Sequence, residues 1–232
     1  MCGDRLPDEA ALFLMLRGER RVVCDGADHR QRVLTSFFHK KSVPFTVREG
    51  SFGLSLSLPD RLLSGIDQSR FGGFWKLEHP FSQRLALRLL DAWMRDEPIE
   101  GHLRELLAPC GVLDTARLAA IEPQSIRRSE AFLRASFQGP LHLSDVADEA
   151  CIHPVYLARL FRKLRGCSVM DYVNILRATA AARLVVEDGW TLGAAGAEVG
   201  FFDQAHFDRS CRKSLGIAPR SLRWLKSLAQ SA

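Results

Sequence analysis

The sequence predicts an α+β N-terminal domain, with short β-strands followed by helices, and an all-α C-terminal domain with two helix-turn-helix units joined by a long helix. Three observations lead to this fold class. The first sixty residues hold β-prone runs, helical periodicity takes over afterwards, and residues 143–166 and 192–216 repeat each other. A chain of 232 residues can bury two modest cores.

The N-terminal strands are predicted from short β-prone runs between turn residues. They cover residues 11–16, 21–24, 31–38, 45–48 and 52–58. Gly18, Gly26, Pro44 and Gly50 separate these runs, as turn residues do. The last run alternates apolar and small polar residues with period two, which is typical of a half-buried strand.

Helices are expected next, around residues 81–94 and 126–137. Phe81, Leu85, Leu89 and Ala92 form one apolar stripe, and further apolar residues widen it. Such a helix either packs densely within its own domain or against a second subunit. Residues 111–123 are interpreted as a connector, and Gly139-Pro140 ends the second helix.

The repeat defines the C-terminal domain. A shift of 49 aligns Leu143 with Leu192, and a shift of 50 then aligns Leu157 with Phe207. The extra residue falls in the turn, where length varies most easily. The two helix-turn-helix units are predicted at about 143–165 and 192–215. A stiff, alanine-rich helix at about 168–187 links them.

The second helix of each unit is expected to divide into two faces. Pro154 suits the first helical position and Asp203 suits an N-cap. The inward side chains are predicted to be Leu157, Leu160, Phe161 and Leu164, then Phe207, Cys211 and Leu215. The outward ones are Val155, Ala158, Arg159 and Arg162, then Ala205, Asp208, Arg209 and Arg212.

Charge suggests an anionic partner for the C-terminal half. Residues 1–124 carry 17 basic and 17 acidic residues, whereas residues 125–232 carry 15 and 10. Arginine can bridge guanine O6 and N7 with two hydrogen bonds. Lys163, Arg165 and Lys213 are interpreted as phosphate contacts. A solvated basic face without a partner is the alternative.

The remaining motifs favour neither metal binding nor catalysis. His29, His39, His79 and His102 are widely spaced, and no nucleophile signature is present, so we expect no enzyme, metal or cofactor. The six cysteines form no C-x-x-C pair and are expected to be buried, reduced thiols. The apolar run at residues 10–16 is too short for a signal peptide or a membrane span, which favours a cytoplasmic location.

Residues 140–224 resemble the DNA-binding domain of AraC/XylS-type transcriptional regulators. The resemblance rests on residues 177–185, 199–209 and 216–223. It implies two helix-turn-helix units that read successive major-groove segments of double-stranded DNA. It also implies that Val155, Ala158, Arg159 and Arg162, then Gln204, Ala205, Asp208, Arg209 and Arg212, lie at or near the DNA, with Lys163 and Lys213 beside them.

The same resemblance implies a sensor or dimerisation domain at residues 1–122, ahead of a DNA-binding domain at 123–232. A homodimer, contact with RNA polymerase and a small-molecule effector follow as expectations. Two other functions stay open: a small-molecule-binding or enzymatic N-terminal domain with an accessory DNA-binding module, and a binding module without an effector. Gly193, Gly196 and Cys211 predict that the second unit is the looser one.

Overall fold

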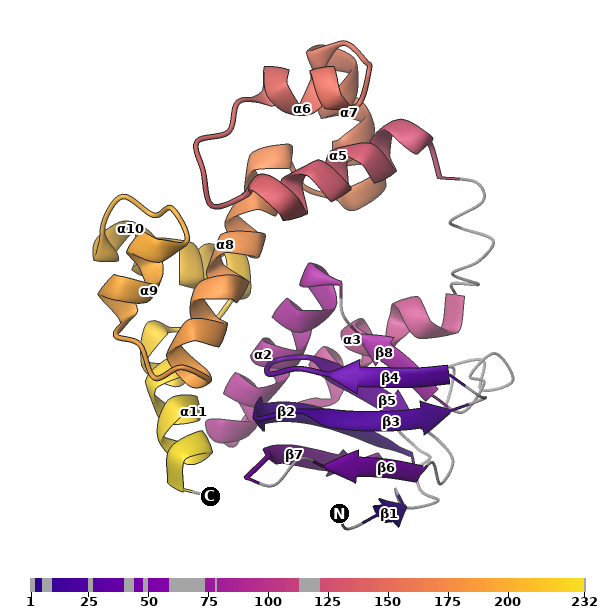
Figure 1. Ribbon diagram of the computed structural model, residues 1–232, viewed down its shortest axis with the longest axis vertical. Coiled ribbons are helices and arrows are strands. Elements are labelled where there is room, and N and C mark those ends of the chain that lie inside the picture. Colours follow the sequence, from indigo (N-terminus) through magenta and orange to yellow (C-terminus); the bar gives the residue numbers. More distant parts are fainter. Residues whose placement is uncertain are drawn as a thin grey trace.

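The computed structural model describes residues 3–5, 10–24, 27–39, 44–47, 50–58, 74–77, 79–112 and 122–231 (Figure 1). Its strands are β1 (Gly3–Arg5), β2 (Ala11–Arg17), β3 (Arg20–Cys24), β4 (Ala27–Gln31), β5 (Ser36–His39), β6 (Pro44–Val47), β7 (Phe52–Ser57) and β8 (Phe74–Leu77). They pair in antiparallel fashion into two four-stranded sheets, ordered β1-β6-β3-β4 and β7-β2-β5-β8.

Helices follow the sheets. They are α2 (Pro80–Met94), α3 (Glu100–Val112), α5 (Gln124–Ser136), α6 (Leu143–Glu149), α7 (Pro154–Arg165), α8 (Val169–Val186), α9 (Leu192–Glu198), α10 (Gln204–Ser210), the π-helix η2 (Cys211–Leu215) and α11 (Pro219–Ser231). The N-terminal half therefore combines strands with helices, and the C-terminal half is helical, as the sequence predicts. None of these helices is both long and apolar enough to cross a membrane.

The predicted strand at residues 31–38 is wrong. β4 ends at Gln31, and β5 begins at Ser36 after a tight turn in which Leu34 has a φ of +60°. The Thr35 side chain holds the turn, because its Oγ1 donates to the carbonyl oxygen of Arg32 at 2.6 Å and accepts from the Arg32 N–H. Residues of the predicted run thus belong to two strands of different sheets.

Helix α2 packs within the molecule, as one of the two interpretations of its wide apolar face predicts. Leu87, Leu89 and Leu90 are buried, and Leu85 and Met94 pack against the same cluster from its edge. His79 is the N-cap of this helix: its Nδ1 accepts from the N–H of Phe81 at 3.4 Å.

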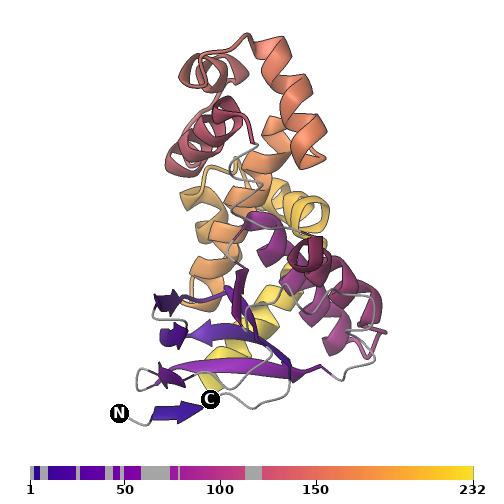
Figure 2. The ribbon, with the colours of Figure 1, turned by 90° about the vertical axis from the view of Figure 1, so that its right-hand side faces the viewer.

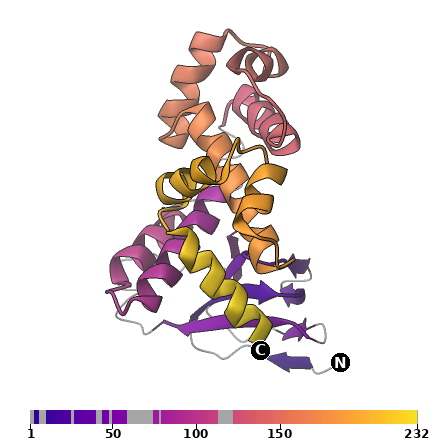
Figure 3. The same ribbon diagram turned by 90° about the vertical axis from the view of Figure 1, so that its left-hand side faces the viewer.

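Among the residues that the structure describes, apolar side chains form two clusters, and the larger one joins both halves of the chain. It contains Leu12 and Leu16 of β2 together with Ala182 of α8 and Leu225 of α11. Helix α11 lies along the sheet (Figure 3), where Arg17 donates from Nη1 to the carbonyl oxygen of Ala229 at 2.8 Å. The domain boundary between residues 122 and 123 stays a prediction, since the larger cluster contains residues from both sides of it.

The smaller cluster lies farther from the sheets, among α5, α6, α7 and the first half of α8 (Figure 2). Its buried members include Leu133, Phe161 and Tyr172. Helix α8 contributes to both clusters, which explains why 11 of its residues are buried. The linking helix is therefore a shared core element of the molecule.

Candidate nucleic-acid interface

Two pairs of helices flank α8. The pair α6–α7 lies near one end, and the pair α9–α10 packs along the other part (Figure 1). The 18 residues of α8 give it a length of about 27 Å. This length is comparable to one turn of duplex DNA, about 34 Å.

Helix α7 begins and ends as its sequence predicts. Pro154 occupies the first turn, and the Nδ1 atom of His153, the N-cap, accepts from the N–H of Val155 at 3.3 Å. Gly166 ends the helix with a φ of +69°, which glycine adopts without a steric penalty. Leu157 and Phe161 are fully buried and anchor the helix to the rest of the molecule.

The outer face of α7 carries the side chains that were predicted to contact DNA. Val155, Arg159, Arg162 and Lys163 are exposed, and Ala158 is half-buried. Three basic groups therefore project from a helix whose small residue, Ala158, allows close approach. A groove-reading helix requires this combination.

Helix α10 and η2 present a second face of the same kind. The Asp203 side chain caps α10 by accepting from the N–H of His206 at 2.6 Å. Phe207, Cys211 and Leu215 are fully buried, as predicted. The exposed residues are Gln204, Ala205, Arg209, Arg212 and Lys213, and Asp208 is half-buried.

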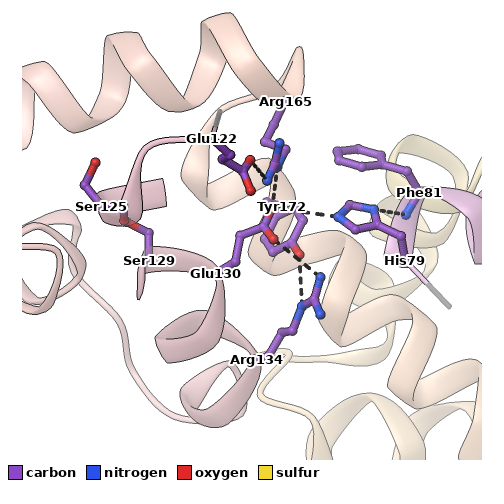
Figure 4. A network of polar contacts seen from close by, with 9 residues as sticks. All are labelled: His79, Phe81, Glu122, Ser125, Ser129, Glu130, Arg134, Arg165 and Tyr172. Carbon is purple, nitrogen blue, oxygen red and sulfur yellow. Dashed lines mark hydrogen bonds and ion pairs between the residues drawn. The ribbon is translucent and has the colours of Figure 1, made fainter. Parts of the chain in front are cut away.

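Two predictions for α7 are wrong. Leu164, expected to point inward, is 41% exposed. Arg165, expected to contact phosphate, instead donates to the carboxylates of Glu122 and Glu130 (Figure 4), and its side chain is only 18% exposed. Helical periodicity could not reveal these partners, because they are 43 and 35 residues away in the sequence.

Two side chains of the second face differ in their polar contacts. Lys213 forms an ion pair with Asp171 of α8 at 3.0 Å, and the Ser168 hydroxyl donates to the same carboxylate. These interactions hold the pKa of Asp171 below its usual value. The Oδ1 atom of Asp208 is buried and has no hydrogen-bond partner among the described residues.

Sequence reasoning missed two aromatic side chains beside these faces. Tyr156 in α7 is 56% exposed, and Phe202, directly before the N-cap of α10, is 92% exposed. The repeat aligns Tyr156 with His206, so the equivalent position of the two units holds two different side chains. Only their exposure in the folded chain identifies them as surface residues.

Comparison with known proteins identifies the C-terminal region. Residues 146–224 match a family model described as a helix-turn-helix domain. The chain is 24% identical over 109 residues to the regulatory protein PocR of Salmonella typhimurium. It is 29% identical over 144 residues to the arabinose operon regulatory protein of Escherichia coli.

These similarities cover part of each relative. The alignments include 47% and 53% of this chain, but only 36% of PocR and 46% of the arabinose regulator. Among solved structures, a transcriptional regulator with an AraC-type DNA-binding domain from Chromobacterium violaceum is 25% identical, with a TM-score of 0.43. That match covers 47% of this chain and 96% of the Chromobacterium chain.

Proposed function

We propose that this chain is a sequence-specific transcriptional regulator of the AraC type with two recognition helices, because residues 146–224 match a helix-turn-helix family model and the chain is similar to the arabinose operon regulatory protein. The observation that carries the proposal is the matched pair of exposed arginines in each unit. Arg159 and Arg162 occupy the same outward steps in α7 as Arg209 and Arg212 occupy in α10 and η2. Surface charges placed at random would not be expected to fall at equivalent positions of the two units.

The proposed roles follow from chemistry and position. Arg159 and Arg209 lie one turn inside their helices and can reach base edges, with guanine as the preferred partner. Lys163 and Lys213 lie one turn farther along and are suited to phosphates, which position the protein without specifying sequence. Val155, Ala158, Gln204, Ala205 and Asp208 complete the proposed interface.

The test is selection of bound sequences from a random duplex pool. We expect a motif with two parts about one helical turn apart. Arg159→Ala should relax one part and Arg209→Ala the other. Arg104→Ala, which removes an exposed arginine from α3, is the matched control and should leave both parts intact. Salt-sensitive binding without any enriched motif would contradict the proposal.

The N-terminal half is proposed to carry effector control. A cavity of about 440 Å³ supports this, lined by Gly18, Glu19, Arg32, Arg183 and Glu187. It lies between turns of the sheets and the last turn of α8, so a bound molecule would contact both halves. A change in DNA affinity on adding a small molecule would support effector control. The homodimer and the contact with RNA polymerase remain predictions.

A further inference from the structure

The start of α2 reaches from the N-terminal half into the smaller apolar cluster (Figure 4). The ring of His79 stacks on Phe81 with 5.3 Å between centroids, and Phe81 lies 5.8 Å from the ring of Tyr172 in α8. Tyr172 in turn makes an edge contact with Phe161 of α7 at 5.4 Å. A continuous row of aromatic rings therefore runs from α2 to the proposed recognition helix.

A polar route joins the same two elements. His79 Nε2 lies 3.7 Å from Glu130 Oε1, and Glu130 accepts from Arg165 at the end of α7. Arg134 also donates to Glu130, at 3.4 Å, and to the hydroxyl of Tyr172, at 3.3 Å. The Glu130 side chain is only 11% exposed, so its direction is fixed by these partners rather than by water.

The second proposed recognition helix, α10 with η2, contacts residues other than His79 and Glu130. Gly216, which ends η2, lies against the side chain of Arg88, about two and a half turns of α2 away from His79. Lys213 of η2 is paired with Asp171. The first turn of α2 thus contacts Tyr172 of α8 and Glu130 of α5, which in turn contact α7, whereas a later part of α2 contacts η2.

We propose that His79 and Glu130 are positioning residues that fix the orientation of α7 on DNA. Through them, the N-terminal half sets how the first unit reads bases. Glu130 holds Arg165 and thereby the last turn of α7, and His79 holds Glu130 from the N-terminal side. This inference rests on the proposed function, since it requires α7 to contact base edges.

The experiment compares sequence selection by the full chain and three variants. His79→Ser keeps an oxygen that can cap α2 but removes the group that faces Glu130. Glu130→Gln keeps the shape and removes the charge. Arg95→Gln is the control, because it removes an ion pair with Asp91 at the far end of α2. Thermal unfolding of each variant is measured in parallel.

We expect both test variants to lower base preference about fivefold to tenfold in the part of the motif that Arg159→Ala identifies. Preference in the part identified by Arg209→Ala should stay within about twofold. The control should change neither part. If Glu130→Gln fails to fold, His79→Ser alone decides.

Three outcomes would overturn the inference. Unchanged preference in both parts would mean that α7 is positioned without this network. Equal loss in both parts, together with a lower unfolding temperature, would mean that the contact only stabilises the fold. A wild-type protein that selects no two-part motif would overturn both the proposed function and this inference. The first two outcomes require a wild-type motif and leave the proposed function standing.

Discussion

Gly200 follows α9 with a φ of +91°, and its absent Cβ faces the protein backbone. A Cβ built there would lie 2.4 Å from the carbonyl oxygen of Gln138. That oxygen belongs to a loop that Arg177 holds, by donating to the carbonyls of Phe137 and Gly139 at 2.6 and 2.7 Å. The loop is held in place and cannot move away at low cost.

Gly200→Ala should therefore destabilise the protein more than Gly166→Ala. Gly166 also has a positive φ, of +69°, but no atom lies within 4 Å of a Cβ built there. We expect a loss of about 1 kcal/mol for Gly166→Ala from backbone strain alone, and at least about 2 kcal/mol for Gly200→Ala. Urea unfolding measures both. Equal losses would show that the loop yields to the new methyl group.

The environment of Glu130 predicts that the folded state loses stability in acid. Burial alone raises the pKa of this carboxyl, but the interactions with His79 and Arg165 outweigh burial and lower the pKa from 4.5 to about 2. A folded-state pKa below the unfolded one gives stability that is present above pH 4.5 and is lost as the pH falls toward 2.

Between pH 6 and pH 3, the wild-type free energy of unfolding should fall by about 2 kcal/mol more than that of Glu130→Gln. Glu105→Gln is the control, since Glu105 is 53% exposed and pairs only with Arg88 among the described residues. Its pH profile should follow that of the wild type. Parallel profiles for wild type and Glu130→Gln would contradict the lowered pKa.

At the scale of elements, the second helix pair is better packed than its sequence suggests. Gly196 of α9 faces the side chain of Phe207, and a Cβ there would lie 3.0 Å from the Phe207 Cβ. Glycine thus permits close contact between α9 and α10 instead of loosening them. Leu192, Ala195 and Phe207 all belong to the larger cluster.

This packing suggests that the second helix-turn-helix unit is the more stable of the two. Helix propensity alone predicts the opposite. Amide hydrogen exchange should be slower in the buried parts of residues 192–215 than in residues 143–165, because the former share a core with the sheet β7-β2-β5-β8. Exchange resolved by peptide mass measures this. Faster exchange in 192–215 would restore the importance of Gly193 and Gly196 as weak helix formers.

The sequence predicts elements well where the determinants are local. Pro154 and Asp203 mark helix starts by capping chemistry, and period-two alternation marks β7. It fails where distant residues decide. The Leu34 N–H donates to the carbonyl oxygen of Met15 at 2.8 Å, and Arg165 pairs with carboxylates 35 and 43 residues away, so neither the turn nor these partners is visible in a periodic pattern.

On the proposed DNA-contacting faces, too, local features are predictable from the sequence and distant contacts are not. Anchors such as Leu157 and Phe207 were placed correctly, since one helix determines its own apolar side. The restraint on Lys213 was not foreseen, because Asp171 lies 42 residues away. The route from His79 to Glu130 was also invisible, since a widely spaced histidine gives no sign of its partner.

At the scale of the whole molecule, the shared core makes the two halves interdependent. Leu16 of β2 is fully buried in the cluster that also holds Val185 of α8 and Leu225 of α11. Leu133 of α5 is equally buried, but in the smaller cluster. Replacing either leucine by alanine removes the same atoms, but from a different apolar cluster of the chain.

Leu16→Ala and Leu133→Ala should each cost about 2 to 5 kcal/mol, because each leaves a cavity. Their patterns of faster hydrogen exchange should differ. Leu16→Ala should affect the sheet β7-β2-β5-β8 together with the second half of α8 and α11, whereas Leu133→Ala should affect α5, α6 and α7. If Leu16→Ala accelerated exchange in the strands alone, the sheets and the C-terminal helices would be separate folding units. The sheet would then be unable to influence α10 through a common core.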